Sequence, residues 1–237
     1  MYVSRHMNKL LKFPKAQFPK LVFLSDMHYT HDREFLWGDR GFSSVEEHDA
    51  FLIENWHKHI DEDTVVFNLG DVVFRDPDAK KFEFISNLPC KSHYMLFGNH
   101  NSGSKEVYKA KVKSILGDQM GEDFELYPVP HNNVIFCGED LVIRVGKKEI
   151  HMSHFPKRIW DHMAGYGKSI HLSGHSHGSD EERNVASTKG RCLDVGVENA
   201  LKHSGNIFFT YDEIIDIMET KVVQQLDHHD ENTAPSR

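Results

Sequence analysis

The amino-acid sequence predicts an α/β domain in which buried strands end in polar loops. Short, continuous apolar runs such as Leu21–Leu24 and Val65–Phe67 have the composition of strands that are buried on both faces. Amphipathic helical patterns lie between these runs, and this alternation is typical of a sheet covered by helices. Histidines and aspartates come directly after the runs. We therefore expect a sheet that gathers polar side chains at one edge.

Composition limits the kinds of protein that this chain can be. With 237 residues, of which 39% are hydrophobic, it is long enough for one large core. We expect a single domain over residues 1–226 and a disordered polar tail over residues 227–237. The net charge of −8 argues against a general nucleic-acid-coating surface, because such proteins concentrate lysine and arginine.

Cysteine usage and the N-terminal segment bear on location. The three cysteines are far apart, so they indicate neither a disulfide framework nor a cysteine-based zinc site. The first twenty residues contain no long apolar run for a signal peptide or a membrane span. We expect a cytoplasmic protein that does not enter a membrane; its oligomeric state stays open.

The first strand and the first long helix frame a polar loop. The strand at 21–24 leads into Ser25-Asp26-Met27-His28, and residues 29–42 are predicted to form a loop. Ser44 and Glu47 form a capping box that begins a helix. Its apolar face comprises Val45, Leu52, Ile53, Trp56 and Ile60.

Two more strands end in the same way. The strand at 64–67 is followed by Asn68-Leu69-Gly70-Asp71, and a strand at 93–97 is followed by Gly98-Asn99-His100-Asn101. Between them, Asp76-Pro77 predicts the start of a helix that carries Phe82, Ile85 and Leu88. Another helix is expected over residues 104–116.

The second half of the chain is richer in strands. Residues 133–151 are predicted to form two or three antiparallel strands, with turns at 138–140 and 146–148. The apolar run at 150–152 precedes His154, and the run at 169–172 precedes Gly174-His175-Ser176-His177-Gly178. In an extended segment, His175 and His177 project to the same side. Further strands are expected at 192–197 and 207–211.

The polar residues at the strand ends form a candidate metal centre. The pair His175 and His177 taken alone is equally well explained as part of a polar surface loop, but five separate segments repeat the arrangement of polar residues after a strand. The combination of oxygen and imidazole ligands suits Mn, Fe, Zn or Ni. The candidates are Asp26, His28, Asp71, Asn99, His154, His175 and His177, with His100 next to Asn99.

The order of these residues resembles a known family. They stand as Asp-x-His at 26–28, Gly-Asp at 70–71, Gly-Asn-His at 98–100, a single His154, and Gly-His-x-His at 174–177. This pattern is similar to the signature of the calcineurin-like metallophosphoesterase superfamily, and the resemblance spans residues 21–200. Residues 40–47 and 154–156 also look like a small, uncapped bacterial and phage branch. The resemblance implies a four-layer αββα sandwich of two mixed sheets flanked by helices.

The resemblance also implies a chemistry. Two divalent ions (Mn, Ni, Fe or Zn) would be held, with a shared hydroxide as nucleophile and His100 as the acid that protonates the leaving group. The implied activity is hydrolysis of a small phosphoester, above all a nucleotide-type phosphodiester. One ion would take Asp26, His28 and His177, the other Asn99, His154 and His175, and Asp71 would bridge them.

Two departures from the family pattern and two alternatives accompany this hypothesis. Asn101 stands where the family has an acid that would orient His100, and Gly70–Arg75 lacks the Asp-Arg-Gly continuation typical of Ser/Thr protein phosphatases. The absence of this continuation disfavours phosphoprotein substrates.

The alternatives are a broad phosphomonoesterase and a nucleotide-binding protein that retains metal but catalyses weakly.

Weaker candidates lie near the first ligand pair. Arg40 and His31 could hold a phosphate of the substrate, although exposed loop residues would look the same in sequence. His48-Asp49 resembles the core of another class of phosphohydrolase, but it lies in an amphipathic helix and is predicted to be part of the helix surface.

Overall fold

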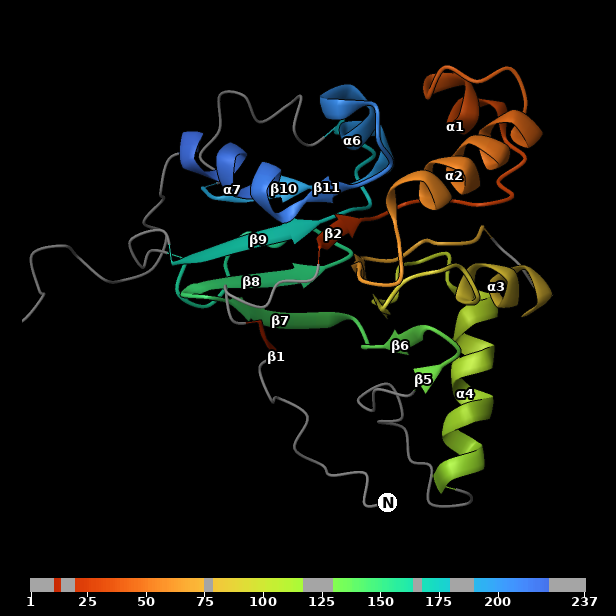
Figure 1. Cartoon of the computed structure of the whole chain (residues 1–237), viewed down its shortest axis with the longest axis horizontal. Helices are drawn as coiled ribbons and strands as arrows, with labels where there is room; N and C mark the ends of the chain where they lie inside the picture. Colours follow the sequence, from red (N-terminus) through yellow and green to blue (C-terminus); the bar gives the residue numbers. More distant parts are fainter. Residues whose placement is uncertain are drawn as a thin grey trace, which may run out of the picture.

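The computed structural model describes residues 11–13, 20–74, 79–116, 130–163, 168–179 and 190–221. Two mixed β-sheets face each other, and helices flank them (Figure 1). The predicted α/β class with two mixed sheets is therefore confirmed. The helix start expected at Asp76-Pro77 and the tail at 227–237 lie outside the described residues.

The six-stranded sheet has the order β11-β2-β3-β4-β6-β5. Its four central strands run parallel, and the edge strands β11 and β5 run antiparallel to their neighbours. The carboxyl ends of β2, β3 and β4 therefore meet at one edge, where their following loops come together. The strands are β2 (Leu21–Leu24), β3 (Val65–Asn68), β4 (Ser92–Met95), β5 (Pro130–His131), β6 (Val134–Phe136) and β11 (Phe209–Thr210).

The five-stranded sheet has the order β1-β7-β8-β9-β10. Strands β7 and β8 form an antiparallel hairpin, whereas β8, β9 and β10 run parallel. The loops after β8 and β9 thus leave the same end of this sheet. The strands are β1 (Leu11–Phe13), β7 (Asp140–Val145), β8 (Lys148–Ser153), β9 (Ser169–Ser173) and β10 (Cys192–Asp194).

The expected antiparallel hairpin with a turn at 146–148 is confirmed by β7 and β8, but the expectation that the turn at 138–140 joins two antiparallel strands was wrong. Strand β6 pairs with β4 in one sheet, whereas β7 pairs with β1 and β8 in the other. The chain crosses between the sheets near Gly138, which has a left-handed φ of 78° and whose carbonyl accepts the N–H of Phe97. A glycine turn is locally the same in a hairpin and in a crossover, so the sequence pattern did not distinguish them.

The alternation of side chains along β2 divides the apolar core in two. Leu21 and Phe23 join the core between the sheets, where the ring of Phe23 stacks on Phe67 with centroids 5.1 Å apart. Val22 and Leu24 point the other way and join a second core under helices α2, α3 and α4. A strand that is buried on both faces is held firmly in register, so the loop after it has a fixed starting point.

The helices confirm part of the sequence pattern. Ser44 caps α2 by accepting the N–H of Glu47, as the capping box predicted. A short helix, α1, lies inside the predicted loop at 29–42 and buries Leu36. Residue 197, expected to end a strand, begins α6 instead. The helices are α1 (Glu34–Asp39), α2 (Val45–His59), α3 (Ala79–Ser86), α4 (Ser102–Leu116), α6 (Val197–Ser204) and α7 (Tyr211–Thr220). None of the described helices has the length and apolar character needed to cross a membrane.

Candidate metal centre

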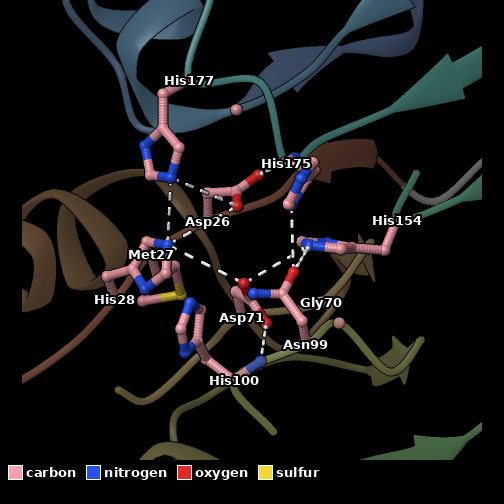
Figure 2. Close-up of polar contacts among 12 residues, drawn as sticks. Asp26, Met27, His28, Gly70, Asp71, Asn99, His100, His154, His175 and His177 are labelled. Carbon is pink, nitrogen blue, oxygen red and sulfur yellow. Dashed lines mark hydrogen bonds and ion pairs between the residues drawn. The ribbon is translucent and has the colours of Figure 1, made fainter. Parts of the chain in front are cut away.

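Five loops at the carboxyl ends of β2, β3, β4, β8 and β9 bring their polar side chains together (Figure 2). Backbone hydrogen bonds tie neighbouring loops to one another: the N–H of His28 donates to the carbonyl of Asp71, and that of Gly174 donates to the carbonyl of His154. The N–H of His175 donates to Asp26 Oδ2 at 2.8 Å. The two sheets thus contribute to a single cluster.

The first group consists of Asp26, His28 and His177. Asp26 Oδ1 lies 3.6 Å from His28 Nε2 and 3.8 Å from His177 Nε2. The two Nε2 atoms are 3.3 Å apart, and their rings stack at an angle of 14°. One carboxylate oxygen and two imidazole nitrogens therefore face a common point, which is an arrangement suited to a divalent transition metal.

The second group consists of Asn99, His154 and His175. Asn99 Oδ1 lies 3.0 Å from His154 Nε2 and 3.0 Å from His175 Nδ1. The carbonyl of Leu69 lies 3.0 Å from His154 Nδ1, which favours the tautomer that leaves Nε2 free to face the cluster. An amide oxygen and two imidazoles again converge.

Asp71 lies between the two groups. Its Oδ2 is 3.3 Å from His154 Nε2 and 3.9 Å from His28 Nε2. Its Oδ1 accepts the backbone N–H of His100 at 2.8 Å, and this contact fixes the orientation of the carboxylate. The side chain is 1% exposed, so its negative charge faces imidazoles rather than solvent.

A buried carboxylate oxygen without a hydrogen-bond partner indicates that the cluster suits a cation. Asp26 Oδ1 and His28 Nδ1 are both buried, and neither has a hydrogen-bond partner among the described residues. Burying an unpaired carboxylate oxygen is costly. A metal ion bound beside Asp26 Oδ1 would remove that cost, so the donor set present here suits such an ion.

The backbone of the cluster is strained where the side chains converge. Non-glycine residues adopt left-handed φ angles of about 50–70° infrequently, and such conformations concentrate at functional sites. Five of the seven candidate ligands have them: Asp26 (58°), His28 (51°), Asp71 (53°), His175 (67°) and His177 (49°).

Gly98 leaves room for the second group. A β-carbon on this residue would lie against Asp71 Oδ1 and only 2.8 Å from His154 Cε1. Any larger residue would push these two side chains apart, so the loop after β4 requires glycine here.

Electrostatics follow from burial and from the neighbouring charges. Burial disfavours ionisation of Asp26, but the nearby ring of His28 and the charges of His154 and His177 outweigh it and lower the pKa of Asp26. Burial lowers the pKa values of His28 and His175. For His154, burial is outweighed by the hydrogen bond to Asp71, so its pKa is raised. The ionised aspartate and the neutral His28 and His175 are in the protonation states that bind metal.

His100 lies at the margin of the cluster. Its ring is 5.5 Å from that of His28 and 5.0 Å from that of Phe74, measured between centroids. Asn101 stands next to it in the sequence, where the family pattern has an acid. The side-chain Oδ1 of Asn101 accepts the backbone N–H groups of Asp71, at 3.0 Å, and of Gly98. Asn101 thus holds two ligand-bearing loops together.

The structure corrects the interpretation of Arg40. Its side chain is 0% exposed, and its guanidinium donates to the carbonyls of Asp26 and Met27 and to Glu198. These bonds hold the first ligand loop, so we assign Arg40 a structural role in place of phosphate binding. His31 is buried beside His28, with ring centroids 5.4 Å apart, and burial lowers its pKa to about 4. A substrate contact by neutral His31 stays a prediction.

The sequence reasoning missed three residues that support the cluster. Glu198 accepts from His177 Nδ1 at 2.7 Å, and although burial opposes its ionisation, Arg40 and His177 lower its pKa to about 2. Asp194 accepts from Ser176 Oγ and from the N–H of Gly178, both in the loop of His175 and His177. Both acids lie at or after the end of β10, so the rule that polar residues at strand ends are candidates would have found them.

His48 is the third missed residue, and its predicted place on a helix surface was wrong. It is 0% exposed, and Arg40 Nη1 donates to its Nε2 at 2.7 Å. Its Nδ1 lies 3.1 Å from Asp49 Oδ1, and the same carboxylate accepts the N–H of Thr30. These contacts link α2 to the loop after β2.

Comparisons with known proteins agree with the fold and leave the activity open. The chain matches no protein-family model. It is 32% identical over 82 residues to an uncharacterized protein from Methanocaldococcus jannaschii, and the match covers 35% of this chain and 47% of the relative. The chain thus matches about half the length of that relative.

A solved structure is similar over most of the chain. It is the crystal structure of a protein of unknown function from Aquifex aeolicus, with a TM-score of 0.55 and 18% sequence identity. The match covers 84% of this chain and 98% of the other. At this level of identity the similarity concerns the fold alone.

Proposed function

We propose that this protein is a dinuclear metal-dependent phosphoester hydrolase of the calcineurin-like metallophosphoesterase type. The observation that carries the proposal is the convergence of two ligand groups on either side of Asp71, with Asp26 Oδ1 buried and unpaired between imidazoles. The order of these residues along the chain is the order in which the resemblance places them.

Each ligand group would hold one divalent ion, and two such ions supply an activated water and neutralise the oxygens of a phosphoryl group. The residues of this chain supply the rest. Asp71 lies between the groups and would hold both ions at a fixed separation. Asn99 contributes a neutral oxygen, which limits the negative charge that an anionic substrate would meet.

The acid that protonates the leaving group would be His100. It is half-buried beside His28, and its backbone N–H is fixed by Asp71 Oδ1. An imidazole that lies next to the ligands without being one of them can deliver a proton to the departing alkoxide.

A cavity beside the first ligand group supports a small substrate. It has a volume of about 710 Å³, within the range of pockets that hold small molecules. Both apolar and charged residues line it, among them Phe35, Leu36, His177, Glu198, Leu201 and Lys202. One substituent of a phosphodiester, such as a nucleoside, could occupy this cavity while the phosphate contacts the ligand groups.

The proposal is tested with metal-stripped protein resupplied with Mn²⁺, Ni²⁺, Zn²⁺ or Mg²⁺. We expect a transition metal to restore hydrolysis of bis(p-nitrophenyl) phosphate, and Asp71→Asn to abolish it. Asp216→Asn is the matched control, because Asp216 is exposed on α7, a helix that carries none of the ligands. It should leave activity unchanged.

The substrate comparison separates the proposal from its alternatives. Faster hydrolysis of p-nitrophenyl phosphate than of the diester would favour a phosphomonoesterase. Binding of two metal ions without hydrolysis of either compound or of nucleotide esters would contradict the enzymatic proposal and favour a binding protein.

A further inference from the structure

We propose that Glu198, held by Arg40, is a positioning residue that makes His177 a stronger metal ligand and so favours occupancy of the first ligand group over the second. The inference rests on the metal centre of the proposed function. Glu198 belongs to no part of the family signature given above.

The hydrogen bond between Glu198 and His177 determines which nitrogen of the imidazole is free. Glu198 Oε1 lies 2.7 Å from His177 Nδ1. A carboxylate can only accept, so Nδ1 carries the hydrogen and donates it. The lone pair is then on Nε2, the atom that faces Asp26 Oδ1 and His28 Nε2. A carboxylate behind an imidazole also raises the basicity of its ligand nitrogen.

Arg40 fixes the carboxylate in turn. Its Nε and Nη2 lie 2.8 and 2.7 Å from the same Glu198 oxygen. The other bonds of the guanidinium reach the carbonyls of Asp26 and Met27 and the ring of His48. The carboxylate is therefore tied to the loop that carries Asp26 and His28. Because Arg40 has a fully buried side chain, the three groups form a rigid unit.

The two ligand groups differ in what holds the imidazole nitrogens that do not face the cluster. In the second group, His154 Nδ1 faces the backbone carbonyl of Leu69, which is a weaker, neutral acceptor. His175 faces Asn99 through its Nδ1. Among the described contacts of the ligand imidazoles, a carboxylate outside the ligand set supports only His177. The first group is consequently the better preorganised of the two.

The test compares metal binding by wild type and Glu198→Gln. Metal-stripped protein is titrated with Co²⁺, visible absorption is followed, and bound metal is counted after equilibrium dialysis. We expect wild type to bind two ions in separable steps. In Glu198→Gln the tighter step should weaken by about 10- to 100-fold, whereas the other should change by less than about 3-fold.

Glu149→Gln provides the matched control. Glu149 also accepts from an arginine, Arg144, and lies 2.9 Å from a histidine, His162 Nδ1, but this histidine is 61% exposed and belongs to neither ligand group. The control reproduces the loss of an Arg–Glu–His arrangement, and both Co²⁺ affinities should match wild type.

Each outcome decides the proposal. Two unchanged steps in Glu198→Gln would overturn it, because the carboxylate would then be dispensable for metal binding. Equal weakening of both binding steps would also overturn it. So would the loss of both steps together with the circular dichroism signal of the folded protein. In either case Glu198 would support the fold as a whole and not His177 in particular. If wild type binds no Co²⁺, the proposed metal centre itself fails, which is a different result.

Discussion

Asp194 offers a quantitative test of how the His175–His177 loop is held. This carboxylate is 2% exposed, accepts the N–H of Gly196 at 2.7 Å and that of Gly178 at 3.1 Å, and also accepts from Ser176 Oγ. Burial, together with the nearby charge of Asp26, raises its pKa to about 6 from an ordinary value of 3.8, despite these hydrogen bonds. The proposed change is Asp194→Asn, which removes the charge and keeps the shape.

The sign of the effect follows from proton binding. Because the pKa of Asp194 is higher in the folded state, the folded protein holds more protons than the unfolded chain between about pH 4 and 6. Its contribution to the free energy of unfolding therefore falls as the pH rises through this window. A shift of about 2 units at about 1.4 kcal/mol each gives a loss of about 3 kcal/mol, complete above pH 6.

The amide introduced by Asp194→Asn cannot titrate, so the variant does not lose this part of its unfolding free energy as the pH rises. Urea denaturation of metal-stripped wild type and variant at pH 4, 5, 6 and 7 gives the difference in unfolding free energy at each pH. Between pH 4 and 7 that difference should move by about 3 kcal/mol in favour of the variant. Lost hydrogen bonds add a constant offset. A difference that stays flat with pH, or moves in favour of wild type, would refute the reasoning.

The remaining predictions concern the supporting loops and the last helix. Asn101→Ala leaves the backbone amides of Asp71 and Gly98 unpaired and should lower the free energy of unfolding by about 2–4 kcal/mol, measured by urea denaturation. The control is Asn87→Ala at an exposed position, which should change the free energy of unfolding by less than about 0.5 kcal/mol. Gly98→Ala should displace Asp71, cost about 1–3 kcal/mol and prevent binding of two Co²⁺ ions; unchanged dialysis counts would contradict this. Thr210→Ala removes the capping box of α7 and should lower stability by about 1 kcal/mol, seen as a lower melting temperature without loss of metal.

The strands that carry the ligands could be predicted because their sequence signal is local. Continuous apolar runs such as those of β2 and β3 have few alternatives to a strand buried on both faces, and chain order fixes which residues come after each run. The positions of Asp26 and Asp71 at the sheet edge could therefore be predicted directly. The crossover at Gly138 was missed, since a turn in the sequence does not specify which sheet the next strand joins.

The supporting residues were missed for a different reason. Arg40 and Glu198 are 158 positions apart, and nothing in either neighbourhood predicts that they meet. A buried arginine is rare, so both roles that the sequence left open for Arg40, phosphate binding and an ordinary loop residue, assumed an exposed side chain. The role of Asn101 could not be predicted either, because its side-chain oxygen reaches two backbone amides, one of them 30 positions away at Asp71. Long-range packing decides such contacts.

The central claim is that two ligand groups on either side of Asp71 hold metal ions, and anomalous X-ray scattering tests it most directly. Crystals grown from protein loaded with Mn²⁺ or Zn²⁺ should give two anomalous peaks. One should lie among Asp26, His28 and His177, the other among Asn99, His154 and His175, both next to Asp71. The account would be contradicted if protein loaded with either metal gave no anomalous peak in the cluster, or gave peaks only elsewhere in the molecule.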